Sequence, residues 1–261
     1  MGVLNITPDS FSDGGVALDP ARAIDLALAL EADGADIIDI GAESTRPGAA
    51  AVDAQQEWAR LRPVLEALPA RVRVPISVDT YKADVARRAL DTGVAIINDI
   101  SGLEYDPALG ALVGLRGAAL VLMHTRGRSG DMYKHATYDD VVTDVARELQ
   151  RSIECAVGQG VEWNRLLIDP GLGFAKRAKH SFTILAELDR FAALGRPLLI
   201  GPSRKSFLTA ATGPAAADER DWATAAGVTA AILAGAHIVR VHRVREMVQV
   251  ARVADAVRNA S

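Results

Sequence analysis

Short apolar runs alternate with amphipathic segments along this 261-residue chain, and this repeat constrains the fold more than any other feature. Each run of Val, Ile and Leu leads into a polar loop and then into 12 to 20 residues with apolar positions at helical spacing. The runs predict eight strands, near residues 2–6, 36–41, 75–79, 95–99, 119–124, 166–170, 197–201 and 237–241. Strand–helix units whose strands are apolar on both faces predict an α/β fold, a (β/α)8 TIM barrel forming one domain over residues 1–261. A doubly wound open sheet is the alternative, although its outer strands would be apolar edges.

Composition narrows the class of protein. With 49% hydrophobic residues the chain can bury a large core, and a net charge of −4 gives no reason to expect nucleic acid or a membrane as partner. No apolar run is long enough to span a bilayer, and we find no export signal. The single Cys155 cannot form an internal disulfide, so we expect a buried, inert thiol in a cytoplasmic protein.

Nearly every predicted strand ends on a polar or charged side chain or leads into one. These residues are Asn5, Glu43, Asp79, Asn98, His124, Asp169, Ser203 and Arg240. Barrel enzymes build their sites from the C-terminal ends of the strands, whereas a purely structural protein has no need of reactive groups there. The pattern therefore predicts an enzyme with one composite site.

Two carboxylates and an amide form the first group of candidates. Asp79, Asn98 and Asp169 each follow an apolar run, at the rim of an interior of low dielectric constant. A carboxylate accepts two N–H bonds from an amidine-like edge, and an amide both donates and accepts, so the three suit a flat, nitrogen-rich ring. Taken alone, either Asp has the alternative interpretation of a helix N-cap.

The second group is basic and lies after the last two strands. Ser203, Arg204 and Lys205 are predicted to open a helix, and strand alternation puts Arg240 and His242 on one face. Barrels commonly hold phosphate at this place, and a buried guanidinium without an anion would be costly. For Arg204 and Lys205 a solvated basic rim is the alternative. Asn5 faces the same mouth and could contact an anion or its metal, while we interpret His124 as a hydrogen-bonded structural residue.

Read together, these segments resemble the dihydropteroate synthase family over almost the whole chain. The resemblance rests on seven motifs in family order, at residues 2–15, 39–48, 77–80, 97–100, 169–174, 203–205 and 240–242. It implies condensation of 6-hydroxymethyl-7,8-dihydropterin diphosphate with 4-aminobenzoate, with Mg²⁺ as cofactor, by a dissociative route. It also implies a homodimer and inhibition by sulfonamides.

The resemblance also assigns roles to residues. Asp79, Asp169, Lys205, Arg240 and His242 would be catalytic. The pterin would be bound by Asp79, Asn98, Asp169, Lys205, Met123 and Gly201, and the diphosphate by Asn5, Thr45, Arg240 and His242. The aminobenzoate would contact Phe11, Thr45, Arg46, Pro47, Phe174 and Ser203, and Asn5 would touch the metal. Loops 7–18 and 43–53 would close over the site.

One local departure concerns the last motif. Family members usually have Asp after the Arg-Val-His triplet, where this chain has Arg243. If that Asp orients the His, its loss would weaken diphosphate binding, whereas an extra cation facing the site would strengthen it. Two alternative functions follow from the resemblance: a methyltetrahydrofolate corrinoid methyltransferase, which needs no diphosphate cluster, and a catalytically silent pterin-binding paralogue.

Overall fold

Eight parallel strands close into a barrel in the computed structural model, which describes residues 1–7, 19–44 and 48–260. The strands are β1 (Gly2–Asn5), β2 (Ile38–Gly41), β3 (Ile76–Asp79), β4 (Ile96–Asp99), β5 (Ala119–Met123), β6 (Leu166–Asp169), β7 (Leu199–Ile200) and β8 (Ile238–Val239). Strands β1 to β6 pair in chain order, and β7 pairs with β8. The bridges Ile168–Leu198 and Gly2–Val241 join the two sheets, so the predicted barrel is confirmed and the open sheet is excluded.

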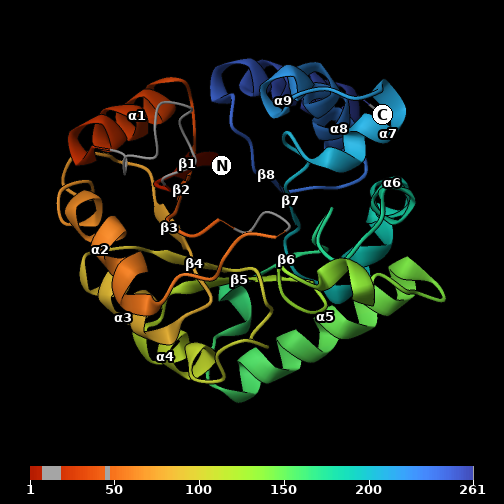
Figure 1. Cartoon of the computed structure of the whole chain (residues 1–261). Helices are drawn as coiled ribbons and strands as arrows, with labels where there is room; N and C mark the ends of the chain where they lie inside the picture. Colours follow the sequence, from red (N-terminus) through yellow and green to blue (C-terminus); the bar gives the residue numbers. More distant parts are fainter. Residues whose placement is uncertain (8–18, 45–47, 261) are drawn as a thin grey trace.

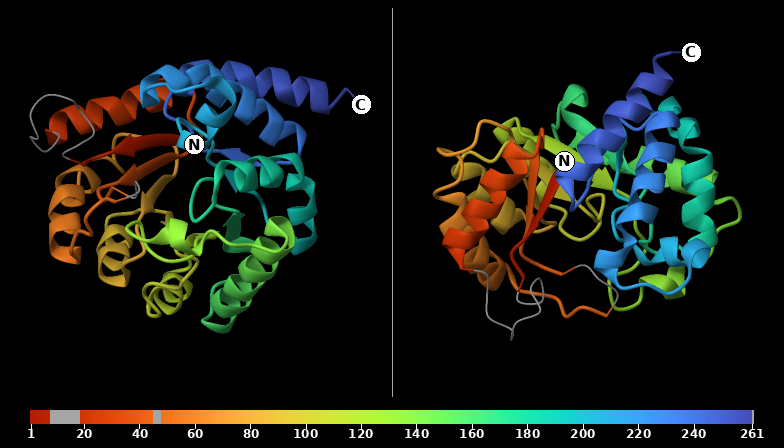
Figure 2. Two further views of the ribbon diagram at one scale, coloured as in Figure 1. Left: turned by 45° about the vertical axis from the view of Figure 1, so that its right-hand side comes forward. Right: turned by 90° about the horizontal axis from the view of Figure 1, so that it is seen from above.

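Helices surround the strands as an outer ring, which runs from α1 to α9 around the view in Figure 1. They are α1 (Pro20–Ala32), α2 (Ala54–Leu65), α3 (Ala83–Asp91), α4 (Leu109–Arg116), α5 (Val141–Gly158), α6 (Ala178–Ala186), α7 (Thr209–Thr212), α8 (Asp221–Leu233) and α9 (Val244–Arg258). Short 3-10 helices are η2 (Met132–His135), η3 (Trp163–Arg165), η4 (Leu188–Leu194), η5 (Ser206–Leu208) and η6 (Ala217–Arg220). The last turn of α9 extends beyond the ring in both views of Figure 2.

Local sequence explains where several helices begin and end. Asp53 and Asp140 are N-caps whose carboxylates accept from backbone N–H groups at 2.8 Å in the first turns of α2 and α5. Gly34 and Gly93 have φ near +100° where α1 and α3 turn back into the sheet. Because glycine adopts such angles without a Cβ penalty, these joints suit the short helix-to-strand turns of a barrel.

Alternation along the strands separates two cores. Residues such as Ile38 and Ile40 pack outward against the helices in the main hydrophobic cluster. Met1, Ile96, Val121 and Leu199 form a smaller cluster that fills the barrel interior. The inner face is less apolar than the sequence predicted, because Asp39 and Ser77 stand opposite each other on β2 and β3, both fully buried.

One sequence prediction is wrong. Cys155 is exposed on α5, since its position in the helical repeat falls on the solvent side, between the buried Ile153 and Ala156. Residues Ser203 to Lys205 lie directly before helical structure, as predicted, because Lys205 is the N-cap residue of η5, which continues into the four-residue α7. Within the described ranges, no helix is both long and apolar enough to cross a membrane.

Candidate active site

A row of polar residues runs across the C-terminal ends of four neighbouring strands, at the end of the barrel that we call the mouth. Strand register aligns Asn5 with Gly41, Gly41 with Asp79, and Asp79 with Asn98. Opposed residues in a parallel sheet point to the same side, so these side chains share the barrel interior. A Cβ built on Gly41 would lie 3.7 Å from Asn5 Oδ1 and 3.7 Å from Asp79 Oδ2. Both oxygens therefore border the space above Gly41 at the mouth.

Arg240 enters this row from the eighth strand and bridges two carboxylates. Its Nε donates to Asp39 Oδ2 at 2.6 Å and its Nη2 donates to Asp79 Oδ2 at 3.1 Å. Asn98 Nδ2 donates to the same Asp39 oxygen at 3.2 Å. Asp39 lies deeper in the barrel, and this one oxygen orients both Arg240 and Asn98. Sequence reasoning missed Asp39, although a carboxylate inside the apolar run 37–40 is itself a signal of a buried charge partner.

Burial and charge set the protonation of this group. Burial raises the pKa of Asp79 to about 7, with Arg240 opposing the rise and Asp39 adding to it. Burial also works against the charge on Arg240, yet the carboxylates of Asp39 and Asp79 hold the pKa of that guanidinium above its usual value. Arg240 is thus a fixed cation, and Asp79 changes charge near neutral pH.

Asp169 and Lys205 are two further charged residues at the mouth. Asp169 ends β6 beside Met123, and its Oδ1 accepts from Gly171 N at 2.7 Å. Lys205 Nζ donates to the carbonyl of Leu172 and lies 4.5 Å from the centre of the Phe174 ring. Burial lowers the pKa of Lys205 to about 8, while Asp169 opposes the fall, and burial raises the pKa of Asp169 against the pull of Lys205.

Ser203 and His242 are joined by two hydrogen bonds. Ser203 Oγ accepts from the backbone N–H of His242 at 3.2 Å and lies 2.9 Å from His242 Nδ1. If the Ser203 hydroxyl donates to Nδ1, the proton of the neutral imidazole is on Nε2. In that tautomer His242 is a donor through Nε2, which suits an anion.

The other predicted residues are located as follows. Met123 is buried at the end of β5, and a Cβ on Gly201 would lie 3.7 Å from Arg240 Cβ. Arg204 pairs with Asp221 at 2.8 and 2.9 Å. His124 is hydrogen-bonded to Glu148 at 2.8 Å, in agreement with a structural role. Phe11, Thr45, Arg46 and Pro47 lie outside the described residues.

Arg243 does not contribute a cation to the mouth. Its Nη2 donates to Glu246 Oε1 at 2.8 Å in the first turn of α9, and its side chain is 55% exposed. In the part of the chain that the structure describes, no group of three or more His, Cys, Asp or Glu side chains is arranged to hold a metal ion.

A closed parallel barrel with buried charges at the C-terminal ends of its strands defines the class, an α/β-barrel enzyme. The family model described as pterin binding enzyme matches residues 1–242. Dihydropteroate synthase of Mycobacterium leprae is 46% identical over 98% of this chain and 92% of its own length. The chain belongs to the pterin binding enzyme family and, within it, to the dihydropteroate synthases.

Solved structures agree with that assignment. Yersinia pestis dihydropteroate synthase, in a sulfonamide drug complex, superimposes with a TM-score of 0.94 at 41% identity, covering 99% of this chain and 93% of the other. The Xanthomonas albilineans enzyme in complex with 7,8-dihydropteroate gives a TM-score of 0.88 at 38% identity, covering 98% and 92%. The likeness extends over the whole barrel.

Proposed function

We propose that this transferase of folate synthesis condenses 6-hydroxymethyl-7,8-dihydropterin diphosphate with 4-aminobenzoate, giving 7,8-dihydropteroate and diphosphate. The observation that carries the proposal is the bridge from Arg240 to Asp39 and Asp79, beside Asn98. Through this bridge, the cation that would bind the leaving diphosphate contacts a carboxylate that would accept hydrogen bonds from the pterin ring. Neither a corrinoid methyltransferase nor a silent binding protein needs this combination.

The pterin would lie across the strand ends. Asp79 and Asp169 accept from the N–H groups of the ring, and the amide of Asn98 both donates and accepts. Lys205 would donate to a ring acceptor, while Met123 and Gly201 would pack against the ring face. Each carboxylate also favours the positive charge that develops on the pterin methylene carbon.

The diphosphate would lie on the opposite side of Arg240. Two N–H donors of the guanidinium bind Asp39 and Asp79, which fixes its plane, and its other donors would meet phosphate oxygens. His242 Nε2 would donate to the same group, and Thr45 would contribute from outside the described residues. Asn5 Oδ1 fits Mg²⁺, which takes oxygen ligands and is commonly shared with substrate phosphates. When bound, Mg²⁺ neutralises charge on the leaving diphosphate.

The aminobenzoate would bind beside Phe174 and Ser203, together with Phe11, Thr45, Arg46 and Pro47 of the two loops. In the dissociative route, the bond between the methylene carbon and oxygen breaks first, and its electron pair leaves with the diphosphate. The amine nitrogen then bonds to the carbon, and its proton passes to the departing diphosphate. A weak aniline nucleophile suffices for such a cation, so the site needs no strong general base, and loop closure would exclude water from the cation.

The experiment is incubation of the protein with both substrates and Mg²⁺, measuring dihydropteroate and diphosphate. Asp79→Asn and Lys205→Ala serve as matched controls. Product well above both controls is expected, and equal rates would refute the synthase even if pterin bound. Omitting 4-aminobenzoate tests the route: diphosphate release without the amine is expected, and strict dependence on the amine would indicate direct displacement.

Sulfonamides resemble 4-aminobenzoate, so we also propose that they inhibit this enzyme competitively with that substrate. An inhibition pattern independent of 4-aminobenzoate concentration would contradict the shared pocket.

We further propose a cytoplasmic homodimer. Exposed apolar side chains on α8 and α9, including Leu233, Val253 and Val257, support an interface there. Sedimentation at several concentrations tests dimer formation, and monomers throughout would refute it.

A further inference from the structure

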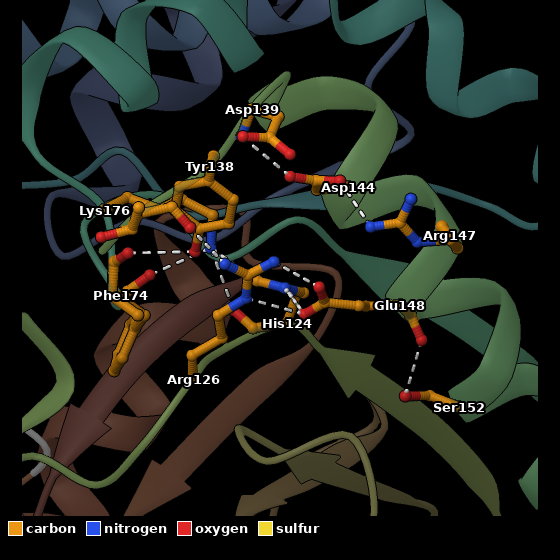
Figure 3. Close-up of polar contacts among 12 residues, drawn as sticks. His124, Arg126, Tyr138, Asp139, Asp144, Arg147, Glu148, Ser152, Phe174 and Lys176 are labelled. Carbon is orange, nitrogen blue, oxygen red and sulfur yellow. Dashed lines mark hydrogen bonds and ion pairs between the residues drawn. The ribbon is translucent and has the colours of Figure 1, made fainter. Parts of the chain in front are cut away.

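A buried lysine outside the mouth ties the fifth strand to the loop that follows the sixth. Lys176 is 1% exposed, and its Nζ lies 2.8 Å from His124 Nδ1, 3.0 Å from the carbonyl oxygen of Phe174 and 3.3 Å from that of His124. Figure 3 shows these contacts converging on one ammonium group. With Nδ1 as an acceptor, the three acceptors match the three N–H donors of a protonated lysine.

His124 continues the network toward the protein surface. If Nδ1 accepts from Lys176, the proton of the ring is on Nε2, which donates to Glu148 Oε2 at 2.8 Å. Arg126 Nε donates to the same carboxylate oxygen at 3.0 Å, and the Arg126 guanidinium stacks 4.1 Å from the Tyr138 ring centre. The orientation of the imidazole is therefore fixed from both sides.

The segment held by Lys176 is residues 170–177, called here the strand-six loop. Ala175 has φ +48° and Gly171 has φ +70°, and non-glycine residues adopt such angles only when surrounding contacts enforce them. Tyr138 Oη donates to the carbonyl of Ala175 at 3.0 Å, and Ser181 Oγ accepts from Gly173 N at 3.1 Å. The loop keeps its shape through these contacts and those of Lys176.

Two parts of the strand-six loop face the mouth. The carbonyl of Leu172 accepts from Lys205 Nζ, and the Phe174 ring lies under the same ammonium group. Lys176 holds the carbonyl of Phe174 itself. A shift of the loop would therefore move both the wall assigned to the aminobenzoate and the partner of Lys205.

Stability alone does not account for a lysine at this position. Burial drives the pKa of Lys176 well below its usual value, and Asp169 opposes the shift. Burying the charged amine therefore lowers the stability of the folded protein. An apolar side chain of similar volume would often stabilise such a site better. What an apolar side chain could not do is bind the carbonyl of Phe174 and the imidazole of His124 at once.

We propose that Lys176 and His124 are positioning residues, which set the strand-six loop so that the Phe174 ring lies where 4-aminobenzoate binds. This inference rests on the proposed function, because it concerns the second substrate of that reaction. Of the residues assigned to the pterin, Asp79 and Asn98 lie on strands that do not contact the loop, whereas Asp169 and Lys205 each contact one backbone group of it. Loss of the pair should therefore affect the two substrates unequally.

Lys176→Met tests the pair, with Lys179→Met as its matched control on the exposed side of α6. We expect the KM for 4-aminobenzoate to rise about tenfold in Lys176→Met, as for the loss of one hydrogen bond to a charged group, and the KM for the pterin diphosphate to change less than about threefold. Lys179→Met should resemble the wild type. A lower melting temperature with both KM values unchanged would show a purely structural role and overturn the inference.

Two His124 variants keep the test decisive if Lys176→Met does not fold. Asn at 124 can offer an oxygen near the Nδ1 position and keep the acceptor for Lys176, whereas Gln can offer an N–H near Nε2 and keep Glu148. His124→Asn should retain the KM for 4-aminobenzoate, and His124→Gln should raise it about tenfold. Equal KM values in the two variants would overturn the inference.

Failure of the proposed function is separable from failure of this inference. A wild-type protein that makes no dihydropteroate refutes the function. Hydrogen exchange needs no turnover: the Phe174 amide, which donates to Gly171 O at 3.1 Å, should exchange faster in Lys176→Met than in Lys179→Met. Unchanged exchange would refute the positioning of the strand-six loop whether or not the chain is a synthase.

Discussion

Asp39→Asn is the substitution that most directly tests how the site is built. Both Arg240 and Asn98 donate to the same oxygen of Asp39, so an Asn oxygen at that position would keep both hydrogen bonds and remove only the charge. Hydrogen bonds to charged groups contribute about 1.5–3 kcal/mol and neutral ones about 0.5–1.5 kcal/mol. Weakening two such bonds predicts a free energy of unfolding lower by about 2 kcal/mol.

The same substitution should change the pH dependence of activity. The Asp39 carboxylate raises the pKa of Asp79, so its removal lowers that pKa while Arg240 remains in place. If binding of the pterin needs ionised Asp79, kcat/KM for the pterin diphosphate falls in the wild type as pH drops through about 7. In Asp39→Asn this fall should move to lower pH, because Asp79 stays ionised in more acidic solution.

Urea unfolding and a pH–rate profile measure both effects. Asp36→Asn is the matched control, since Asp36 is exposed two residues before β2 begins and should change stability by less than about 0.5 kcal/mol. The reasoning fails if Asp39→Asn unfolds like this control and keeps the wild-type acidic limb. A large loss of stability with an unchanged acidic side of the pH–rate profile would refute only the claim that Asp39 raises the pKa of Asp79.

Three further predictions concern single residues. Gly171→Ala puts a Cβ 2.1 Å from the carbonyl oxygen of His124 at a φ of +70°, so it should destabilise the fold by about 3 kcal/mol. Gly117→Ala, with φ +61° and nothing within 4 Å, should cost only about 1 kcal/mol in the same denaturation assay. As Lys205 loses its proton near its pKa of about 8, kcat/KM should fall above that pH in the wild type, whereas Lys205→Met should be weakly active at every pH tested. Phe174→Ala should raise the KM for 4-aminobenzoate about tenfold, through loss of its stacking and of its contact with Lys205, and an unchanged KM would remove Phe174 from that pocket.

The barrel could be predicted because its sequence signal is local and is repeated with every strand. All eight strands lie within the predicted ranges, since burial on both faces demands short apolar runs. Strands β7 and β8 are only two residues long, and the single bridges Ile168–Leu198 and Gly2–Val241 close the barrel beside them. Bridges of that kind depend on register between distant segments, which no local pattern encodes.

The candidate site could be predicted only where side chains stand at strand ends. That rule found Asn5, Asp79, Asn98 and Asp169, which all point into the barrel. It missed Asp39, which lies two residues before the end of β2, and Lys176, which lies in a loop. Both are recognisable only through their partners: Arg240 needs a buried counter-charge, and the carbonyl of Phe174 needs a donor.

Arg243 shows why a motif cannot be interpreted one residue at a time. The replacement of the usual Asp suggested weaker diphosphate binding if that Asp orients the preceding His, and stronger binding if the new cation faces the site. In this chain Ser203 Oγ holds His242 Nδ1 from 39 positions away, so the orientation of the imidazole does not require a carboxylate next to it. The residue at position 243 is then available to pair within α9, as Arg243 does with Glu246. The departure at 243 thus lies on the surface, and the donors assigned to the diphosphate are held by Asp39 and Ser203.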